Sequence, residues 1–231
     1  MKLMQRPQYK VEAAILNDAV EFEGAQALVS DDRAAIVKMG ELYKCVFEDI
    51  RVFSDYAAEY GISGEVCLLG APPDAPAKIG FSAEACTSFA YFDPLPPPCD
   101  PAVTIKRLAP TLAETVHAAY TNPGNADVTH IADIMRDKGV FGAIVNGKLA
   151  GFIGRHGDGS MGMLEVFDGF GGRGIGTALE KFMINYVMSF GRTPICDVFC
   201  QNAASLALQK KIGLTAADGL TFWFYTDDAH R

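Results

Sequence analysis

The chain has 231 residues, of which 49% are hydrophobic and 21% are charged, and its formal net charge is −8. This composition provides enough apolar side chains for a core and excludes a mainly disordered chain. The negative charge argues against a protein that grips nucleic acid, because such binding depends on Lys and Arg neutralising many phosphates. The length fits one large domain or two small ones.

The six cysteines are dispersed, form no CxxC pair and are read as small buried hydrophobic residues in a reducing compartment. The first ten residues lack the apolar run of a secretory signal. No stretch reaches the roughly 18 uncharged apolar residues of a membrane span. No His, Cys and Asp residues have the spacing of metal ligands. We therefore expect a cytoplasmic protein without a membrane segment or metal site.

The first part of the chain has an alternating α/β pattern. We expect strands at 11–16 and 26–29, a helix from Asp31 or Asp32 to about Tyr43, a strand at 45–47, a helix at 51–60 ended by Gly61, and a strand at 65–69. An Asp at the start favours a helix because its side chain accepts from first-turn amides. The proline-rich run from Phe92 to Pro101 deprives the backbone of hydrogen bonds and predicts a linker. The predicted division is a small α/β domain at 1–92, a linker at 93–101 and a second domain at 102–231.

The second part has clearer turn signals. We expect a strand at 103–108, helices at 110–119 and 128–138, strands at 141–145, 149–153 and 161–167, a helix at 175–190, a strand at 195–200, a helix at 203–211 and a strand at 221–225. Asn146-Gly147 is the strongest hairpin signal, because both residue types tolerate the positive φ of a tight turn. The pattern predicts an α+β domain with a mainly antiparallel sheet flanked by helices.

A glycine-rich loop at 169–174 lies between a predicted strand and a predicted helix. This order brings backbone amides and a helix N-terminus together, which suits a phosphate. Gly169, Gly171 and Gly174 satisfy the dinucleotide fingerprint G-x-G-x-x-G, and Asp197 has the spacing of its ribose-binding acid. That fingerprint belongs early in a long parallel sheet, whereas antiparallel hairpins precede this loop. A nucleotide P-loop is excluded, because no Gly-Lys-Ser/Thr follows the glycines.

The run from Gly171 to Thr177 resembles the pyrophosphate loop of the GNAT superfamily of N-acetyltransferases, which has the form Arg/Gln-x-x-Gly-x-Gly/Ala. The stretch from Asn202 to Leu214 is similar to a later motif of that family, and the order of elements agrees across 102–231. The resemblance implies a GNAT-like fold and acetyl-CoA as the cofactor. It places the cofactor contacts at Val166, Gly171, Gly172, Arg173, Gly174, Ile175, Gly176, Thr177, Asn202 and Ser205. Asn202 is equally well explained as the cap of the following helix.

Two positions depart from the family pattern. Gly171 stands where the family has Arg or Gln, and Gln209 stands where many members have a Tyr that protonates the leaving thiolate. The resemblance implies that Glu165 is the general base and that the Val166 amide polarises the thioester carbonyl. A solvent-facing carboxylate on the strand is the alternative interpretation of Glu165.

Other ionisable and polar residues lie near the predicted acceptor side. His117 and His130 fall on the two predicted helices that border it, and each is read first as a surface histidine. Tyr120 and Asn122 fall between those helices and are expected to line the acceptor pocket. These positions indicate where an amine would approach.

The predicted function is an acyl-CoA-dependent N-acetyltransferase that moves an acetyl group to a primary amine by direct attack on the thioester. The acceptor would be a small-molecule or peptide amine. A catalytically inactive acyl-CoA-binding regulatory or interaction protein is the alternative, favoured by Gly171 and Gln209. The first domain would cover the acceptor cleft or form a homodimer contact.

Overall fold

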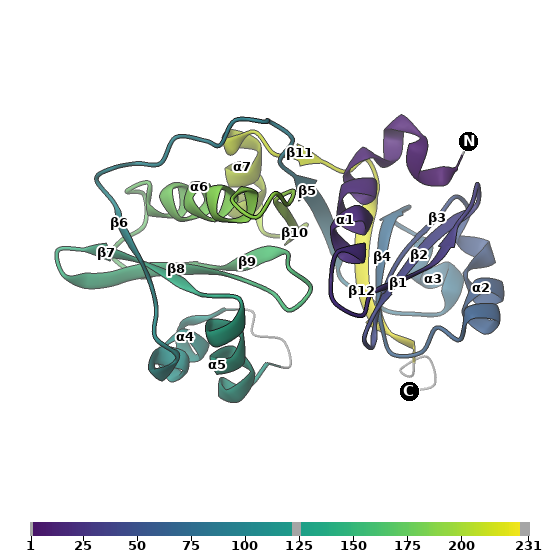
Figure 1. Ribbon diagram of the computed structural model, residues 1–231, viewed down its shortest axis with the longest axis horizontal. Helices are drawn as coiled ribbons and strands as arrows, with labels where there is room; N and C mark the ends of the chain where they lie inside the picture. Colours follow the sequence, from purple (N-terminus) through teal and green to yellow (C-terminus); the bar gives the residue numbers. More distant parts are fainter. Residues whose placement is uncertain (1, 122–125, 227–231) are drawn as a thin grey trace. The chain divides into compact units, whose positions relative to one another are not determined.

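The computed structural model describes residues 2–121 and 126–226, which divide into two compact units (Figure 1). Unit 1 contains residues 1–90 together with 197–231, and unit 2 contains residues 91–196. The predicted mixed α/β fold, with mainly antiparallel sheets flanked by helices, is confirmed. The assignment of separate roles to 1–92 and 102–231 stays a prediction. In the packed chain, the C-terminal segment belongs to the same unit as the N-terminal residues.

Unit 1 is built on one large sheet. Its helices are η1 (Leu3–Gln5), η2 (Pro7–Tyr9), α1 (Lys10–Val20), η3 (Ile50–Val52), α2 (Phe53–Tyr60), α3 (Ala75–Ile79) and α7 (Ala203–Ile212). Its strands are β1 (Gln26–Ser30), β2 (Ala34–Met39), β3 (Leu42–Phe47), β4 (Glu65–Ala71), β5 (Ala85–Ala90), β11 (Thr215–Ala216) and β12 (Leu220–Tyr225). The sheet order is β1-β2-β3-β4-β12-β5-β10, where β10 (Ile195–Phe199) brings the chain into this unit, and β11 pairs with β5.

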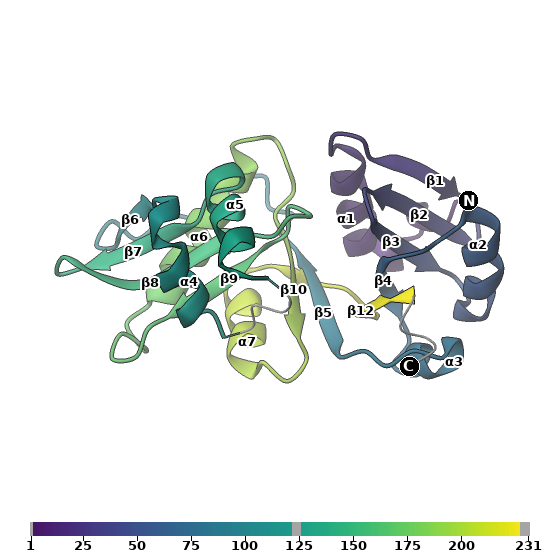
Figure 2. The same ribbon diagram turned by 90° about the horizontal axis from the view of Figure 1, so that it is seen from below.

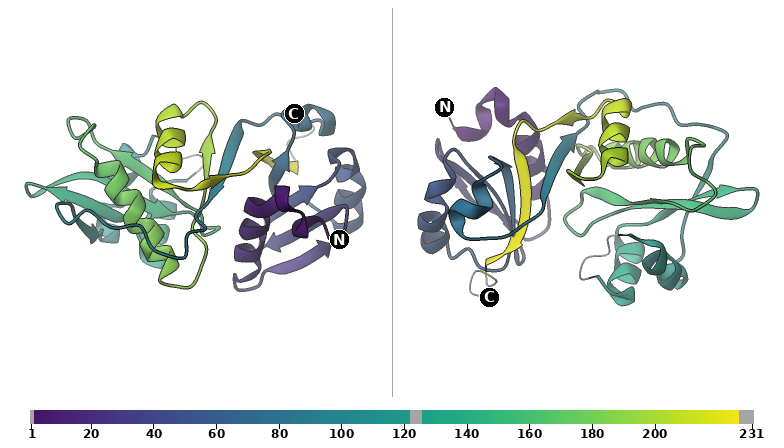
Figure 3. Two further views of the ribbon diagram at one scale, coloured as in Figure 1. Left: turned by 90° about the horizontal axis from the view of Figure 1, so that it is seen from above. Right: turned by 180° about the vertical axis from the view of Figure 1, so that it is seen from behind.

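The C-terminal strand β12 lies between two strands from the first 90 residues and is antiparallel to both (Figure 3). A buried polar network holds β5, β10 and β12 together. The Ser88 hydroxyl donates to Asp197 Oδ1 at 2.5 Å, and the Trp223 indole donates to Asp197 Oδ2 at 3.2 Å. A Cβ at Gly219 would lie 2.4 Å from the carbonyl carbon of Gly70, so β12 and β4 approach as closely as only glycine permits. The last strand is therefore an integral part of this sheet.

Two elements of unit 1 differ from the sequence prediction. Residues 11–16 belong to helix α1, whose buried residues Val11, Ile15 and Ala19 recur at helical spacing. The predicted helix at 31–43 is the hairpin of β2 and β3. Asp31 does accept amide hydrogen bonds, from Arg33 and Ala34, but it does so in the turn between β1 and β2. An Asp that caps a turn has the same local sequence signal as one that caps a helix.

Unit 2 is a four-stranded antiparallel sheet with helices on both faces. Its elements are β6 (Thr104–Arg107), η4 (Pro110–Leu112), α4 (Ala113–Ala119), α5 (Val128–Asp137), β7 (Phe141–Val145), β8 (Lys148–Arg155), β9 (Met161–Val166) and α6 (Ile175–Met188). The strand order is β6-β7-β8-β9. Helix α6 covers one face, and α4 and α5 cover the other (Figures 1 and 2). Asn146 and Gly147 have φ of 51° and 74°, which confirms the predicted tight turn between β7 and β8.

The proline-rich segment 93–101 contains no helix or strand, as predicted for a linker. It is nevertheless anchored to α6. The Asn185 side chain donates to the Pro97 carbonyl at 3.1 Å, and Lys181 Nζ donates to the Pro98 carbonyl at 3.3 Å. Within the described residues, no helix is both long and apolar enough to cross a membrane.

The order of three antiparallel strands, a helix and a strand occurs twice along the chain. In unit 1, the antiparallel strands β1, β2 and β3 are followed by α2 and then by β4, which pairs with β3 in parallel. In unit 2, the antiparallel strands β7, β8 and β9 are followed by α6, after which the chain enters the sheet of unit 1 as β10. The connection from the third strand to the helix is therefore a comparable position in the two units, and its residues can be compared directly.

A buried carboxyl group lies where β12 joins the sheet of unit 1. Glu12 on α1 is 1% exposed, and neither carboxyl oxygen has a hydrogen-bond partner among the described residues. Its Oε1 lies 2.8 Å from where a Cβ of Gly70 would be. Burial raises the pKa of Glu12, its own backbone amide partly opposes this rise, and the negative charge of Asp218 adds to it, so that the pKa lies above its usual value. A charged Glu12 therefore destabilises this part of the fold.

We predict that Glu12 makes the stability depend on pH. Because the folded pKa lies above the unfolded value, stability is fully present below an unfolded pKa of about 4.3 and is lost as the pH rises through the folded pKa. Urea unfolding of Glu12→Gln should therefore gain stability relative to the wild type as the pH is raised from 4.5 to 8, because the neutral amide cannot ionise. The exposed Glu21→Gln is the control. A difference between Glu12→Gln and wild type that is constant with pH would contradict the prediction.

Candidate active site

Strand β9 is the edge strand of unit 2, and it carries an amide directed away from the sheet. The Phe167 amide donates to the Ala150 carbonyl of the β8 segment at 2.9 Å. Successive amides of a strand point to opposite edges, so the Val166 amide points away from β8. In the described chain β9 pairs only with β8. The Val166 N–H is therefore available at the open edge.

A bulge precedes this amide and sets the direction of Glu165. The register of β8 and β9 shifts between Phe152 and Gly154, and Met163 opposite the shift has φ of 53°. Positive φ is uncommon outside glycine and indicates local strain that the surrounding packing maintains. Glu165 Oε1 accepts from the Thr121 amide at 2.7 Å. The carboxyl group thus lies on the face covered by α4 and α5.

A glycine on β8 allows β9 to come close at this point. A Cβ at Gly151 would lie 2.4 Å from the Glu165 carbonyl oxygen and 3.1 Å from the Val166 Cα. Both distances are below normal contact, so any larger residue would move the segment that carries the carboxylate and the free amide. Gly151 could not be recognised from the sequence, because the residue that a strand glycine faces depends on the register of the two strands.

The glycine-rich loop connects β9 directly to α6. Gly169, Gly172 and Gly174 have φ of 81°, 72° and 77°, which is why glycine is required there. A Cβ at Gly174 would meet nothing within 4 Å, so the requirement is conformational. Gly171 has neither a positive φ nor a close neighbour, and its role is not conformational.

Helix α6 begins without a side-chain cap. Its N-cap is Gly174, no side chain bonds to the first turn, and the first turn contains no acidic residue. The amides of Ile175, Gly176 and Thr177 therefore have no intrahelical acceptor and sit at the positive end of the helix dipole. The exposed Arg173 adds a positive charge, and its guanidinium carbon lies 5.7 Å from the centre of the Phe170 ring. The loop as a whole suits an anionic group.

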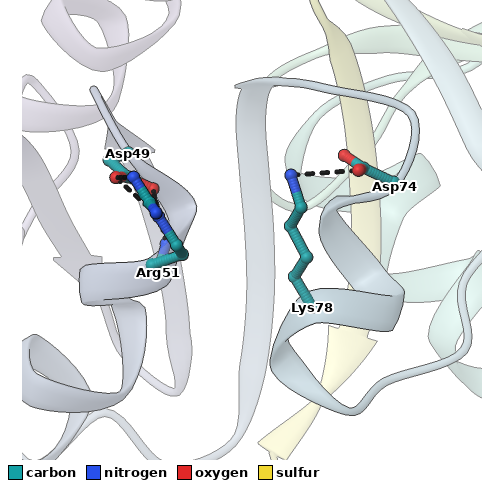
Figure 4. Close-up of polar contacts among 4 residues, drawn as sticks. All are labelled: Asp49, Arg51, Asp74 and Lys78. Atoms are coloured by element: carbon teal, nitrogen blue, oxygen red, sulfur yellow. Dashed lines mark hydrogen bonds and ion pairs between the residues drawn. The ribbon is translucent and has the colours of Figure 1, made fainter.

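The comparable connection in unit 1, from β3 to α2, carries a carboxylate that caps its first helical turn. The Asp49 side chain caps the turn by accepting from the Arg51 amide at 3.0 Å, and the Arg51 guanidinium binds both of its oxygens (Figure 4). Hydrogen bonds from Arg51 lower the pKa of Asp49 to about 2. A second exposed ion pair, Asp74 with Lys78 at 2.9 Å, lies on α3. The carboxylate at the start of the α2 segment disfavours an anion there.

Asn202 and Ser205, the other two predicted contacts, belong to unit 1. Asn202 caps α7, because its side-chain oxygen accepts from the Ser205 amide at 3.1 Å. The capping interpretation is thus observed. Gln209 on α7 is 3% exposed, and its side-chain oxygen has no partner among the described residues. Asp197 is committed to Ser88 and Trp223 in the sheet, which removes the basis for a ribose-binding role.

The remaining predicted residues lie near Glu165 or on the outer surface of the helices. A His117 ring nitrogen lies 3.1 Å from the Ala126 carbonyl oxygen and connects α4 to the residues before α5. Tyr120 is half-buried, His130 is exposed on α5, and Asn122 lies outside the described residues. No group of three or more His, Cys, Asp or Glu side chains among the described residues is arranged to hold a metal ion. Cys99 and Cys200 are exposed, contrary to the expectation of six buried cysteines.

Comparisons with known proteins address the fold of the chain. Residues 139–223 match the family model described as FR47-like protein. No curated protein sequence matches the chain. Among solved structures, a Drosophila protein is 20% identical over 82% of this chain and 73% of its own, with a TM-score of 0.58. A GNAT-family protein from Novosphingobium aromaticivorans is 16% identical over 95% and 96% of the two chains, with a TM-score of 0.53.

A third solved structure, a GCN5-related N-acetyltransferase from Kribbella flavida, is 12% identical over 94% of both chains, with a TM-score of 0.55. These identities establish similarity of fold. The chain therefore has the fold of the GNAT superfamily, with an FR47-like segment in its C-terminal half and additional α/β structure before it.

Proposed function

We propose that this protein is an acyl-CoA-dependent N-acetyltransferase that transfers an acetyl group to the primary amine of a small molecule or peptide. One observation carries the proposal: an unpaired amide at Val166 on the edge of β9 leads directly into a glycine loop and the uncapped start of α6. Amide donors and an anion site follow each other along one short stretch of chain. This is the arrangement that a long thioester cofactor with a pyrophosphate requires.

The residues of the loop fit acetyl-CoA. The amides of Gly171, Gly172, Ile175, Gly176 and Thr177 would hold the pyrophosphate, because they include the uncapped first turn of α6. Gly174 provides the φ of 77° that directs them. Arg173 would add charge-assisted hydrogen bonds from the exposed side. Asn202 has its side-chain oxygen committed to the cap of α7, and the cofactor contacts predicted at Asn202 and Ser205 stay predictions from the sequence.

The chemistry assigned to the chain needs two groups at the end of β9. When bound, acetyl-CoA supplies the activated acetyl group as a thioester. The Val166 N–H would donate to the acyl oxygen and stabilise the charge that develops there. Glu165, oriented through one oxygen by Thr121, would accept the amine proton on its other oxygen while the C–N bond forms. The sulfur would keep the electron pair of the broken C–S bond, leave as the coenzyme A thiolate and take its proton from water.

One chain should hold one cofactor. Strand β3, the counterpart of β9, is paired on both sides, with β2 and with β4, so it offers no open edge. The start of its helix is occupied by Asp49. The succession of an open strand edge, a glycine loop and an uncapped helix start is present at the connection from β9 to α6 and is not present at the comparable connection of unit 1, and unit 1 is proposed to act as a scaffold that incorporates β12.

Replacing Gly174 tests the cofactor site. We predict that Gly174→Val weakens acetyl-CoA binding at least about tenfold in calorimetric titration, because a β-branched residue cannot hold φ near +77° without strain. Gly157→Ala, at an exposed position in the turn between β8 and β9, is the matched control and should bind as well as the wild type, since its φ is not positive and its Cβ would meet nothing within 4 Å. Equal affinities for both variants, or no binding by the wild type, would contradict the proposal.

Replacing Glu165 tests the assigned base. We predict that Glu165→Gln lowers kcat/KM for acetyl transfer about 100-fold or more with little change in acetyl-CoA affinity, because the amide keeps the Thr121 hydrogen bond and cannot accept a proton. Glu114→Gln, an exposed change on α4, is the control for an added amide. An unchanged rate in Glu165→Gln would show that this carboxylate is not the base.

A second candidate function is an acyl-CoA-binding regulatory protein without catalysis. The buried amide of Gln209 favours it, since this residue stands where the family often has a proton-donating Tyr. Stoichiometric acetyl-CoA binding by the wild type, with no transfer to any amine in a broad screen, would support this alternative over the transferase.

A further inference from the structure

The chain that leaves α4 is tied to β9 next to the proposed base. The Thr121 amide binds Glu165 Oε1 at 2.7 Å. The contact between the His117 ring and the Ala126 carbonyl, 3.1 Å apart, joins the end of α4 to the residues before α5. The end of α4 is therefore hydrogen-bonded both to Glu165 on β9 and to the residues before α5.

Tyr120 is the residue that leaves α4 and turns toward β9. Its amide bonds to the Val116 carbonyl at 2.9 Å, but its φ and ψ of −77° and 117° are extended. The ring packs against the buried cluster that includes Phe152 and Met163. Phe152 is the register partner of Glu165, and Met163 is two residues before Glu165 on β9. This packing places the Tyr120 ring beside the part of β9 that carries Glu165.

The Tyr120 hydroxyl is a hydrogen-bond donor without an assigned acceptor. Burial raises the pKa of Tyr120 to about 12, and the negative charge of Glu165 contributes, whereas the Met163 N–H partly opposes the shift. The phenol therefore keeps its proton at any pH at which the protein would work. Among the described residues, no hydrogen bond from the Tyr120 hydroxyl to a side chain or carbonyl is present. A ligand that displaces water from this half-buried donor without offering an acceptor therefore binds less well than one that offers an acceptor.

We propose that Tyr120 determines acceptor specificity and that the acceptor is an α-amino carbonyl compound, such as an amino-acid amide or a peptide N-terminus. The inference rests on the proposed function. The free oxygen of Glu165 would receive the amine, and the Tyr120 hydroxyl would donate to the carbonyl oxygen of the same molecule. An amine that lacks this oxygen leaves the hydroxyl unpaired. A free amino acid would place its carboxylate close to that of Glu165, so a neutral carbonyl is favoured.

The test compares acceptors that differ only in this group. Phenylalaninamide and 2-phenylethylamine share the ring and the amine, and only the first has the carbonyl. We expect Tyr120→Phe to lower kcat/KM for phenylalaninamide about 10- to 100-fold and to change that for 2-phenylethylamine less than about threefold. Comparing each amine with itself across variants removes the difference in amine basicity. Tyr186→Phe, on α6 at the other face of the sheet, is the matched control and should leave both values unchanged.

Each other outcome overturns the inference in a distinguishable way. An equal loss with both amines would mean that Tyr120 acts through the fold, and no loss with either would mean that its hydroxyl binds nothing. Faster transfer to phenylalanine than to phenylalaninamide would overturn the choice of a neutral carbonyl. A wild type that binds acetyl-CoA but acetylates neither phenylalaninamide nor 2-phenylethylamine would overturn the acceptor class and leave the cofactor site standing. A wild type that does not bind acetyl-CoA would overturn the proposed function itself.

Discussion

The open edge of β9 is the constraint on which the rest of the proposed site depends. A strand with a partner on one side only exposes alternate amides, and Val166 carries one of them just before the chain enters the glycine loop. Gly151 lets β8 support this segment at short range, and the bulge at Met163 directs Glu165 and the Tyr120 environment to the face covered by α4 and α5. The proposed donor and the proposed base therefore lie on one strand, and the proposed acceptor contact, Tyr120, packs against it.

In unit 1 the same order of elements has neither an open edge on the third strand nor an uncapped start of the following helical segment. There the third strand, β3, is paired with β4, and Asp49 with Arg51 fills the start of the helix that follows. Its sheet instead accepts the C-terminal strand, which is fixed by the Ser88, Asp197 and Trp223 hydrogen bonds. The same order of elements thus gives a proposed ligand site at the connection from β9 to α6 and none at the connection from β3 to α2. The difference lies in whether the third strand has a partner on both sides and whether a side chain caps the turn that follows.

Signals that act within a few residues were readable from the sequence. Asn146-Gly147 and Gly61 marked a turn and a helix end because their conformations are local requirements. The glycine-rich loop at 169–174, which includes Arg173, was predicted for the same reason, because its glycines meet a local conformational requirement. Longer-range features were not accessible: the N-terminal helix and the β2 strand depend on the surface they pack against, and the insertion of β12 depends on pairing across more than half of the chain. The hydrogen bond from Thr121 to Glu165, and the position of Tyr120 beside it, required the register of β9.

Amide hydrogen exchange with and without coenzyme A tests the central claim most directly, because the claim concerns backbone amides. Binding should slow exchange at Val166 and across 172–177, where the edge of β9 and the uncapped start of α6 offer donors, and should leave 48–53 unchanged. Unchanged exchange at Val166 and the glycine loop at saturating coenzyme A, or protection at 48–53 instead, would contradict the account.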